Sequence, residues 1–318
     1  MSVPNSSFVT ESASTGLYKF YGTIWKNTYR TQILLIAVSI AIALLAAAPL
    51  YFQQKIINGL TYGIQLNQML LLGAQYAAAA LFTIVLKLFL QYRVAVLGEA
   101  AVRHVRRKIL ANHTDSRRMG SPARYADGTI VSMLTAEAES VGLFVGEAIS
   151  TPLVEVGMLL SILVYITVNE PVLGLFIALI VLPQGLIAGL VQKPVNLLVR
   201  RRVEILRGAV DQTIAADPTS QENAIREAFD EIYRNRRRTH ILKLSSKAAL
   251  NAFTALGSTG TLMIGGWLVL QGQTDVGTVV AALIGLTRIG RPWNNLIKFY
   301  RSLSVVVVRY DLLKEAIE

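Results

Sequence analysis

Residues Ile33–Phe52 read ILLIAVSIAIALLAAAPLYF and carry no charged side chain. A helix of this length, rising about 1.5 Å per residue, crosses a bilayer core of about 30 Å. Five more apolar stretches follow, at Met69–Leu90, Ile149–Val168, Val172–Val191, Ala248–Leu270 and Val276–Leu296. A spanning segment must be a helix or part of a closed barrel, and these runs lack the two-residue alternation of a barrel strand. The predicted fold class is therefore all-α, a polytopic membrane protein with six transmembrane helices.

The basic residues are distributed unevenly between the two sides of these stretches. The chain has 31 Lys and Arg against 20 Asp and Glu, a net charge of +11. Most cations lie before the first stretch or after the second, fourth and sixth, whereas Lys55 is the one cation in the alternate loops. This positive-inside pattern predicts an integral protein of the plasma (bacterial inner) membrane with both termini cytoplasmic. It explains the charge more simply than nucleic-acid binding does.

The chain divides into a short tail and one large domain. We expect residues 1–30 to form a cytoplasmic N-terminal tail, in which the Ser/Thr-rich residues 1–16 lack regular structure, and residues 31–318 to form the six-helix domain. The absence of cysteine excludes disulfides and thiolate metal sites, and no metal site is predicted.

The two long cytoplasmic segments have the pattern of helical hairpins. Apolar residues recur at helical spacing from Gln91 to Ser116, so the second spanning helix is predicted to continue far beyond the membrane. The breaker-rich segment Met119–Pro122 ends this helix, and a new helix begins near Gly128. After the fourth stretch, residues 195–214 and 221–247 form the second hairpin, with its break at 216–220. The sixth helix is predicted to continue to the end of the chain.

Several local motifs occur in an order and spacing known from one family. They are Pro49 followed by INGL at Ile57–Leu60, RHVRRKIL at Arg103–Leu110, YADGTIVSMLT at Tyr125–Thr135, IGGWLVLQG at Ile264–Gly272, VGTVVA at Val276–Ala281, and Pro292. With the six stretches and two hairpins, the chain from about Ile33 resembles the transmembrane domain of an ABC exporter of the type IV fold.

This resemblance implies coupling helices at the two hairpin tips, which dock on ATP-hydrolysing domains. It implies a domain-swapped dimer, homo- or heteromeric, and a nucleotide-binding subunit as partner. Carried over by position, the tips are about Arg118–Asp127 and Ala215–Ala224. The residues expected to couple to the ATPase are Arg118, Tyr125, Asp127, Ala216, Asp217, Gln221 and Glu222.

The sequence departs from the family pattern where an ATPase domain usually follows. It contains no G-x-x-x-x-G-K-[ST] phosphate loop and no Leu-Ser-Gly-Gly signature. We therefore expect no catalytic residue and no cofactor in this chain, with ATP and Mg²⁺ bound by a partner subunit. Three explanations stay open: a separate ATPase subunit, a fragment of a longer transporter, or a different energy source.

Polar residues also occur within the apolar stretches or at their ends, and such residues at membrane depth are costly and tend to be functional. The candidate substrate-cavity residues are Lys87, Glu147, Glu155, Arg288, Arg291, Asn294 and Asn295. Arginines in a cavity wall favour an anionic or zwitterionic ligand. The alternative is that these residues pair with one another or extend to the interface. Glycines at 257, 260, 265 and 266 predict close helix packing in the fifth span.

Three functions are compatible with these observations. The first is the permease subunit of an ABC-type exporter, working by alternating access with an ATPase partner, so that any translocase activity requires that partner. The second is a proton-driven transporter similar to ABC-exporter-like peptide importers, with Glu147 or Glu155 as proton carrier. The third is a membrane scaffold that moves no solute. The sequence does not identify the substrate, because fold does not determine function.

Overall fold

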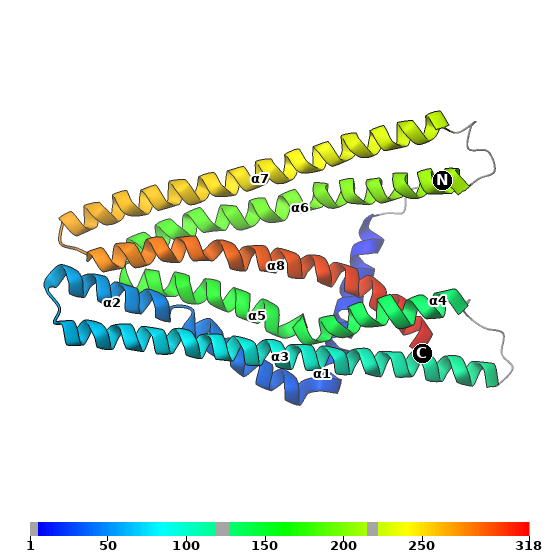
Figure 1. Cartoon of the computed structure of the whole chain (residues 1–318), viewed down its shortest axis with the longest axis horizontal. Coiled ribbons are helices and arrows are strands. Elements are labelled where there is room, and N and C mark those ends of the chain that lie inside the picture. The colour runs from blue at the N-terminus through cyan, green and yellow to red at the C-terminus, as the bar shows by residue number, and fades with distance from the viewer. Residues whose placement is uncertain (1–5, 119–126, 215–221, 318) are drawn as a thin grey trace. The chain divides into compact units, whose positions relative to one another are not determined.

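The computed structural model describes residues 6–118, 127–214 and 222–317. These residues form long helices joined by short turns, without a strand among them (Figure 1). The elements are α1 (Ser6–Leu45), α2 (Ala48–Tyr62), α3 (Leu66–Arg118), α4 (Asp127–Ser132), the π-helix η1 (Met133–Glu137), α5 (Ala138–Asn169), α6 (Pro171–Ile214), α7 (Glu222–Leu270) and α8 (Val276–Ile317). The predicted all-α class is confirmed.

Both predicted hairpins are present as long helices that end near the predicted tips. Helix α3 contains 53 residues and α7 contains 49, so each is more than twice as long as a bilayer crossing requires. Helix α6 passes Pro183 and Pro194 without ending. Helix α8 likewise continues through Pro292 to Ile317, as expected.

The first apolar stretch was predicted to form one uninterrupted helix, but the structure divides it into two. Helix α1 ends at Leu45, and α2 begins at Ala48 with Pro49 in its first turn. Proline lacks the amide hydrogen and clashes with the preceding turn, so it suits a helix start rather than a helix interior. At the other end, α2 is closed by Gly63 with φ 83°, a conformation that favours glycine.

The expectation that residues 1–16 lack regular structure is wrong from Ser6 onward. Helix α1 begins at Ser6 and runs into the first apolar stretch, with a kink at Thr28 where φ is −133°. No proline lies between Ser6 and Pro49, so a helix formed in the apolar stretch can propagate backwards. The Tyr21 hydroxyl donates a hydrogen bond of 3.2 Å to the Ala148 carbonyl of α5, and burial raises the pKa of Tyr21.

Five helical segments among the described residues are long and apolar enough to cross a membrane. They lie at Thr28–Tyr62, Leu66–Thr114, Ile130–Asn169, Pro171–Val199 and Arg226–Leu270. The sixth predicted span, in α8, is not among them, because Arg288, Arg291 and two asparagines lower its hydropathy. Six spans therefore stay a prediction.

The chain forms two compact units. One comprises Met1–Tyr165 with Arg288–Glu318, and the other comprises Ile166–Thr287. The core of the first unit joins α1, α3, η1, α5 and α8 through buried side chains that include Ile24, Ile109, Met133, Phe144 and Val306. A second cluster joins α1 to α3 through Leu35, Ile42, Leu90 and Leu97.

The second unit is built on the hairpin of α6 and α7, which lie side by side in Figure 1. A Cβ added at Gly260 would lie 2.3 Å from the Phe176 ring, and one at Gly265 would lie 2.6 Å from Val279. These glycines therefore permit close packing within the chain, as predicted. Gly266 differs, because an added Cβ there would have no neighbour within 4 Å.

Candidate functional site

A buried carboxyl group lies at the centre of the polar residues in the first unit. Glu155 of α5 is 9% exposed, and its Oε1 accepts a hydrogen bond of 2.7 Å from Asn295 Nδ2 of α8. Lys87 on α3 and Arg291 on α8 lie within electrostatic range of this carboxyl group, but neither forms an ion pair with it among the described residues. Of the seven predicted cavity residues, Glu155 and Asn295 are therefore in direct contact, and Lys87 and Arg291 lie in their surroundings.

The second carboxyl oxygen of Glu155 differs from the first in its hydrogen bonding. Oε2 is buried and has no hydrogen-bond partner among the described residues. A buried polar atom without a partner is costly, since burial removes its bonds to water. The carboxyl group is thus positioned to accept a proton or a hydrogen-bond donor.

The other three predicted cavity residues lie apart from this cluster. Asn294 bonds within its own helix, with Nδ2 donating to the Gly290 carbonyl at 2.9 Å. Arg288 is partly buried and forms no ion pair or hydrogen bond within the described part of the chain. Glu147 lies eight residues, about 12 Å along the helix, before Glu155 and lines a separate pocket.

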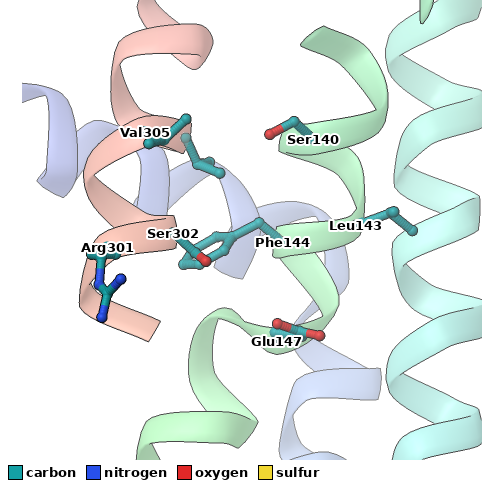
Figure 2. Close-up of a pocket in the computed structure, with 8 residues that line it drawn as sticks. Ser140, Leu143, Phe144, Glu147, Arg301, Ser302 and Val305 are labelled. Atoms are coloured by element: carbon teal, nitrogen blue, oxygen red, sulfur yellow. The ribbon is translucent and has the colours of Figure 1, made fainter. Parts of the chain in front are cut away.

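This pocket lies between the N-terminal part of α5 and the C-terminal part of α8 and has a volume of about 410 Å³ (Figure 2). Its lining residues are Ser140, Leu143, Phe144, Glu147, Arg301, Ser302, Val305 and Val306. Phe144 is buried and stacks on Phe299 of α8, with ring centroids 5.3 Å apart, so the two rings fix the spacing of the helices. Opposite charges, hydroxyls and apolar groups therefore share one concave surface.

Sequence reasoning missed Arg301 as a site residue and treated it only as a cytoplasmic cation. Its spacing from Asn294 offered a signal. Residues seven apart lie on nearly the same face of a helix, so Arg301 continues the face of α8 that carries Asn294.

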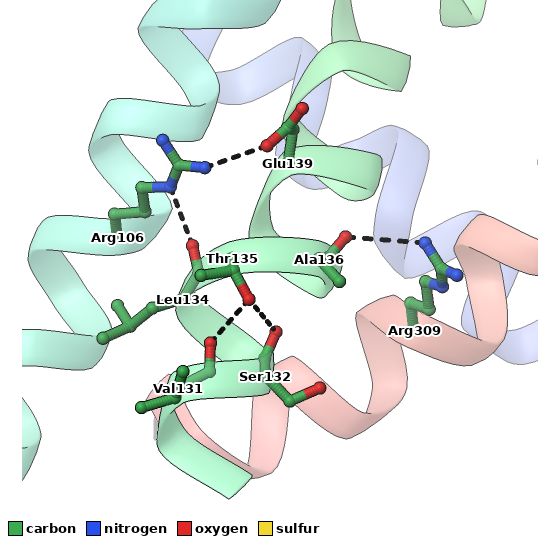
Figure 3. Close-up of polar contacts among 8 residues, drawn as sticks. All are labelled: Arg106, Val131, Ser132, Leu134, Thr135, Ala136, Glu139 and Arg309. Atoms are coloured by element: carbon green, nitrogen blue, oxygen red, sulfur yellow. Dashed lines mark hydrogen bonds and ion pairs between the residues drawn. The ribbon is translucent and has the colours of Figure 1, made fainter. Parts of the chain in front are cut away.

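Along the chain, the π-helix η1 lies between α4 and the residues of α5 that line this pocket. The Ala138 amide bonds to the Met133 carbonyl five residues earlier, as in a π-helix. Figure 3 shows that side chains of α3 and α8 donate to two carbonyls of this segment. Arg106 Nε of α3 donates to the Leu134 carbonyl at 2.8 Å, and Arg309 of α8 donates to the Ala136 carbonyl at 3.5 Å.

Arg106 has a second partner beside η1. Its Nη2 lies 3.1 Å from Glu139 Oε2, although both side chains are about half exposed. Thr135 within η1 bonds back to the Val131 carbonyl at 2.8 Å. No sequence pattern indicated the π-helix, because Met133–Glu137 are ordinary helix residues and the donors that stabilise the segment come from distant parts of the chain.

The residues predicted for ATPase coupling lie at or beyond the edges of the described segments. Arg118 is the last residue of α3, Asp127 is the first of α4, and Glu222 is the first of α7. Tyr125, Ala216, Asp217 and Gln221 lie outside the described residues. The coupling assignments therefore stay predictions.

Comparison with protein families identifies the fold. The family model described as the ABC transporter transmembrane region matches residues 32–205, which is more than half of the chain. The chain belongs to this family. The matched part of this ABC transmembrane region runs from α1 into α6 and includes η1 and Glu155. A comparison with curated proteins found no significant match.

Membership of this family shows in which kind of assembly the chain works. This ABC transmembrane region is an integral membrane protein and a membrane component of an ABC-type transporter. The family as a whole associates with nucleotide-binding subunits and dimerises.

Proposed function

We propose that the chain is the dimeric permease of an ABC-type exporter, driven by a separate nucleotide-binding subunit that docks on its two hairpin tips. The observation that carries this proposal is the length of the helices. At 1.5 Å per residue α3 is about 80 Å long, and a bilayer core occupies only about 30 Å. This length supports a tip that lies far from the membrane, where a soluble partner can bind.

ATP and Mg²⁺ would be bound by the partner, and this chain would convert its motion into alternating access. The packing of the first unit supports that role. Helices α3, α5 and α8 share one core and are joined at η1 by Arg106 and Arg309, so a displacement of the first tip acts on all three together. Both termini would be cytoplasmic and the protomers would form a homo- or heterodimer in the plasma membrane.

Reconstitution in proteoliposomes with the co-purified ATPase tests the proposal. ATP should drive solute movement, and Tyr125→Ala or Asp217→Ala should uncouple ATP hydrolysis from the permease. The exposed Arg236→Ala variant on α7 serves as a control away from the tips. Transport that continues without ATP, or tip variants that behave like Arg236→Ala, would contradict docking at these tips.

A proton-driven transporter is the second candidate, and Glu155 is the observation that favours it. Its carboxyl group is buried within a membrane-spanning segment, with one oxygen bonded to Asn295 and the other without a described partner. Intramembrane carboxyls of this kind often carry protons. Here a protonophore and Glu155→Gln should each abolish transport, whereas ATP-driven transport should withstand the protonophore. A scaffold would move no solute in any of these assays.

A further inference from the structure

The pocket between α5 and α8 presents two opposite charges that are not paired with each other. Glu147 and Arg301 both line it, and both side chains are exposed (Figure 2). Neither forms an ion pair or a hydrogen bond to another residue in the described part of the chain. A surface ion pair would bring them within 4 Å, so the structure holds an anion and a cation apart across one cavity.

The rest of the lining is apolar with two hydroxyls. Phe144, stacked on Phe299, provides an aromatic surface, and Leu143 and Val305 extend it with exposed side chains. Ser140 and Ser302 add groups that can donate or accept hydrogen bonds. A volume of about 410 Å³ suits a small molecule, since ligand pockets commonly measure about 300–1,000 Å³.

The order of these groups along the helices restricts the ligand. Glu147 and Arg301 are the lining residues nearest the predicted spans that begin at Ile149 and end at Leu296. Leu143 and Phe144 precede Glu147, and Val305 follows Arg301, so along both helices the apolar lining lies farther from these predicted spans than the charges do. A bilayer lipid has the reverse order, with its headgroup outside its tails. The order therefore favours a ligand that arrives from water.

We propose that this pocket binds a water-borne zwitterion with an apolar side group, of the class of a short peptide or amino acid with free termini. Its ammonium group is held by Glu147, its carboxylate by Arg301, and its apolar group by the Phe144 surface. Guanidinium groups bind carboxylates with good geometry, and charged hydrogen bonds are the stronger ones. This inference rests on the proposed transport function and gives it a substrate class.

The dipeptide Leu-Phe with free termini is the probe. Its binding to the full chain in lipid nanodiscs is measured by calorimetry, in parallel with the N-acetylated and the C-amidated dipeptide. Because both side chains are exposed, losing one charged contact should weaken binding about fivefold for each blocked terminus. Equal affinity for all three peptides, or no saturable binding, would overturn the proposal.

Two variants test which residue binds the amino terminus of the dipeptide and which binds its carboxyl terminus. Glu147→Gln should reduce affinity for the free dipeptide about fivefold and leave the weaker binding of the N-acetylated form unchanged. Arg301→Gln should do the same for the C-amidated form. Glu99→Gln on α3 and Lys298→Gln on α8 remove exposed charges that do not line this pocket and should change nothing. A charge variant that weakens both forms of its peptide pair equally would refute the assignment.

The binding assay contains no ATPase, so its result is separate from the transport result. If the dipeptide fails to bind while ATP drives transport of another solute, the substrate class is wrong and the permease function stands. If the dipeptide binds with the predicted pattern but tip variants leave transport intact, the site stands and the coupling proposal fails.

Discussion

Replacing Arg106 with alanine should lower the free energy of local opening around the π-helix η1. The contacts of Arg106 in the structure give the size of this decrease. The bond from Arg106 Nε to the Leu134 carbonyl is 2.8 Å long, partly buried and charge-assisted. Such bonds contribute about 1.5–3 kcal/mol. The ion pair with Glu139 is about half exposed and adds no more than about 1 kcal/mol. The local opening free energy around η1 should therefore fall by about 2 kcal/mol.

Hydrogen exchange measured by mass spectrometry in nanodiscs reports this opening peptide by peptide. A loss of about 2 kcal/mol corresponds to about 30-fold faster exchange in peptides covering residues 133–139, because about 1.4 kcal/mol is a factor of ten. Glu139→Gln removes only the exposed ion pair and should accelerate exchange less than about fivefold. Arg103→Ala, an exposed arginine one turn earlier on α3, is the matched control.

The exchange rates of these variants, compared with one another, show which contact of Arg106 stabilises η1. If Arg106→Ala and Glu139→Gln accelerate exchange equally, the exposed ion pair stabilises η1 and the carbonyl bond does not. If Arg106→Ala accelerates exchange no more than Arg103→Ala does, neither contact stabilises η1, and the stabilising role of Arg106 is refuted. A loss of protection throughout α5 would indicate global unfolding, so peptides covering the predicted third span are measured in the same experiment.

Two further predictions test packing and orientation. Gly146→Ala places a Cβ 2.2 Å from the Val94 carbonyl oxygen and should destabilise the protein by about 1–3 kcal/mol, whereas Gly266→Ala meets open space and should be neutral or stabilising by up to about 1 kcal/mol in denaturant unfolding. The chain has no cysteine, so single cysteines report topology directly: one replacing Arg236 should react with a membrane-impermeant maleimide only in inverted vesicles, and one replacing Gln271 only in intact cells. The opposite labelling pattern would contradict the predicted orientation and show that the two sides of the protein are exchanged.

The long helices could be predicted from the sequence because their cause is local. In α3, apolar side chains recur at helical spacing and no proline or glycine pair interrupts them before Met119. Leu97, Val102 and Ile109 are indeed buried along this helix. The same reasoning placed the helix ends near Arg118 and Ile214, where proline and small residues begin.

The polar sites could be predicted only in part because their partners are distant in sequence. The intramembrane position of Glu155 marked it as a candidate, but its hydrogen bond comes from Asn295, 140 positions away. The sequence left open whether such residues face a cavity or pair internally. The structure shows internal bonding for one oxygen of Glu155 and none for the other among the described residues.

Helix α5 connects the features that the proposed function requires. From the first tip, the chain passes through η1, then the pocket at Glu147, and then Glu155, about 27 Å beyond Glu137. A straight α-helix would transmit a push along its axis, but a π-segment can change its hydrogen-bond register and rotate the helix on its C-terminal side. Because Arg106 of α3 and Arg309 of α8 donate hydrogen bonds to the Leu134 and Ala136 carbonyls of η1, we expect such a change to alter the contacts of α3 and α8 as well. On the proposed function, these contacts would couple a displacement of the first tip to the three helices that carry Lys87, Glu155 and Asn295.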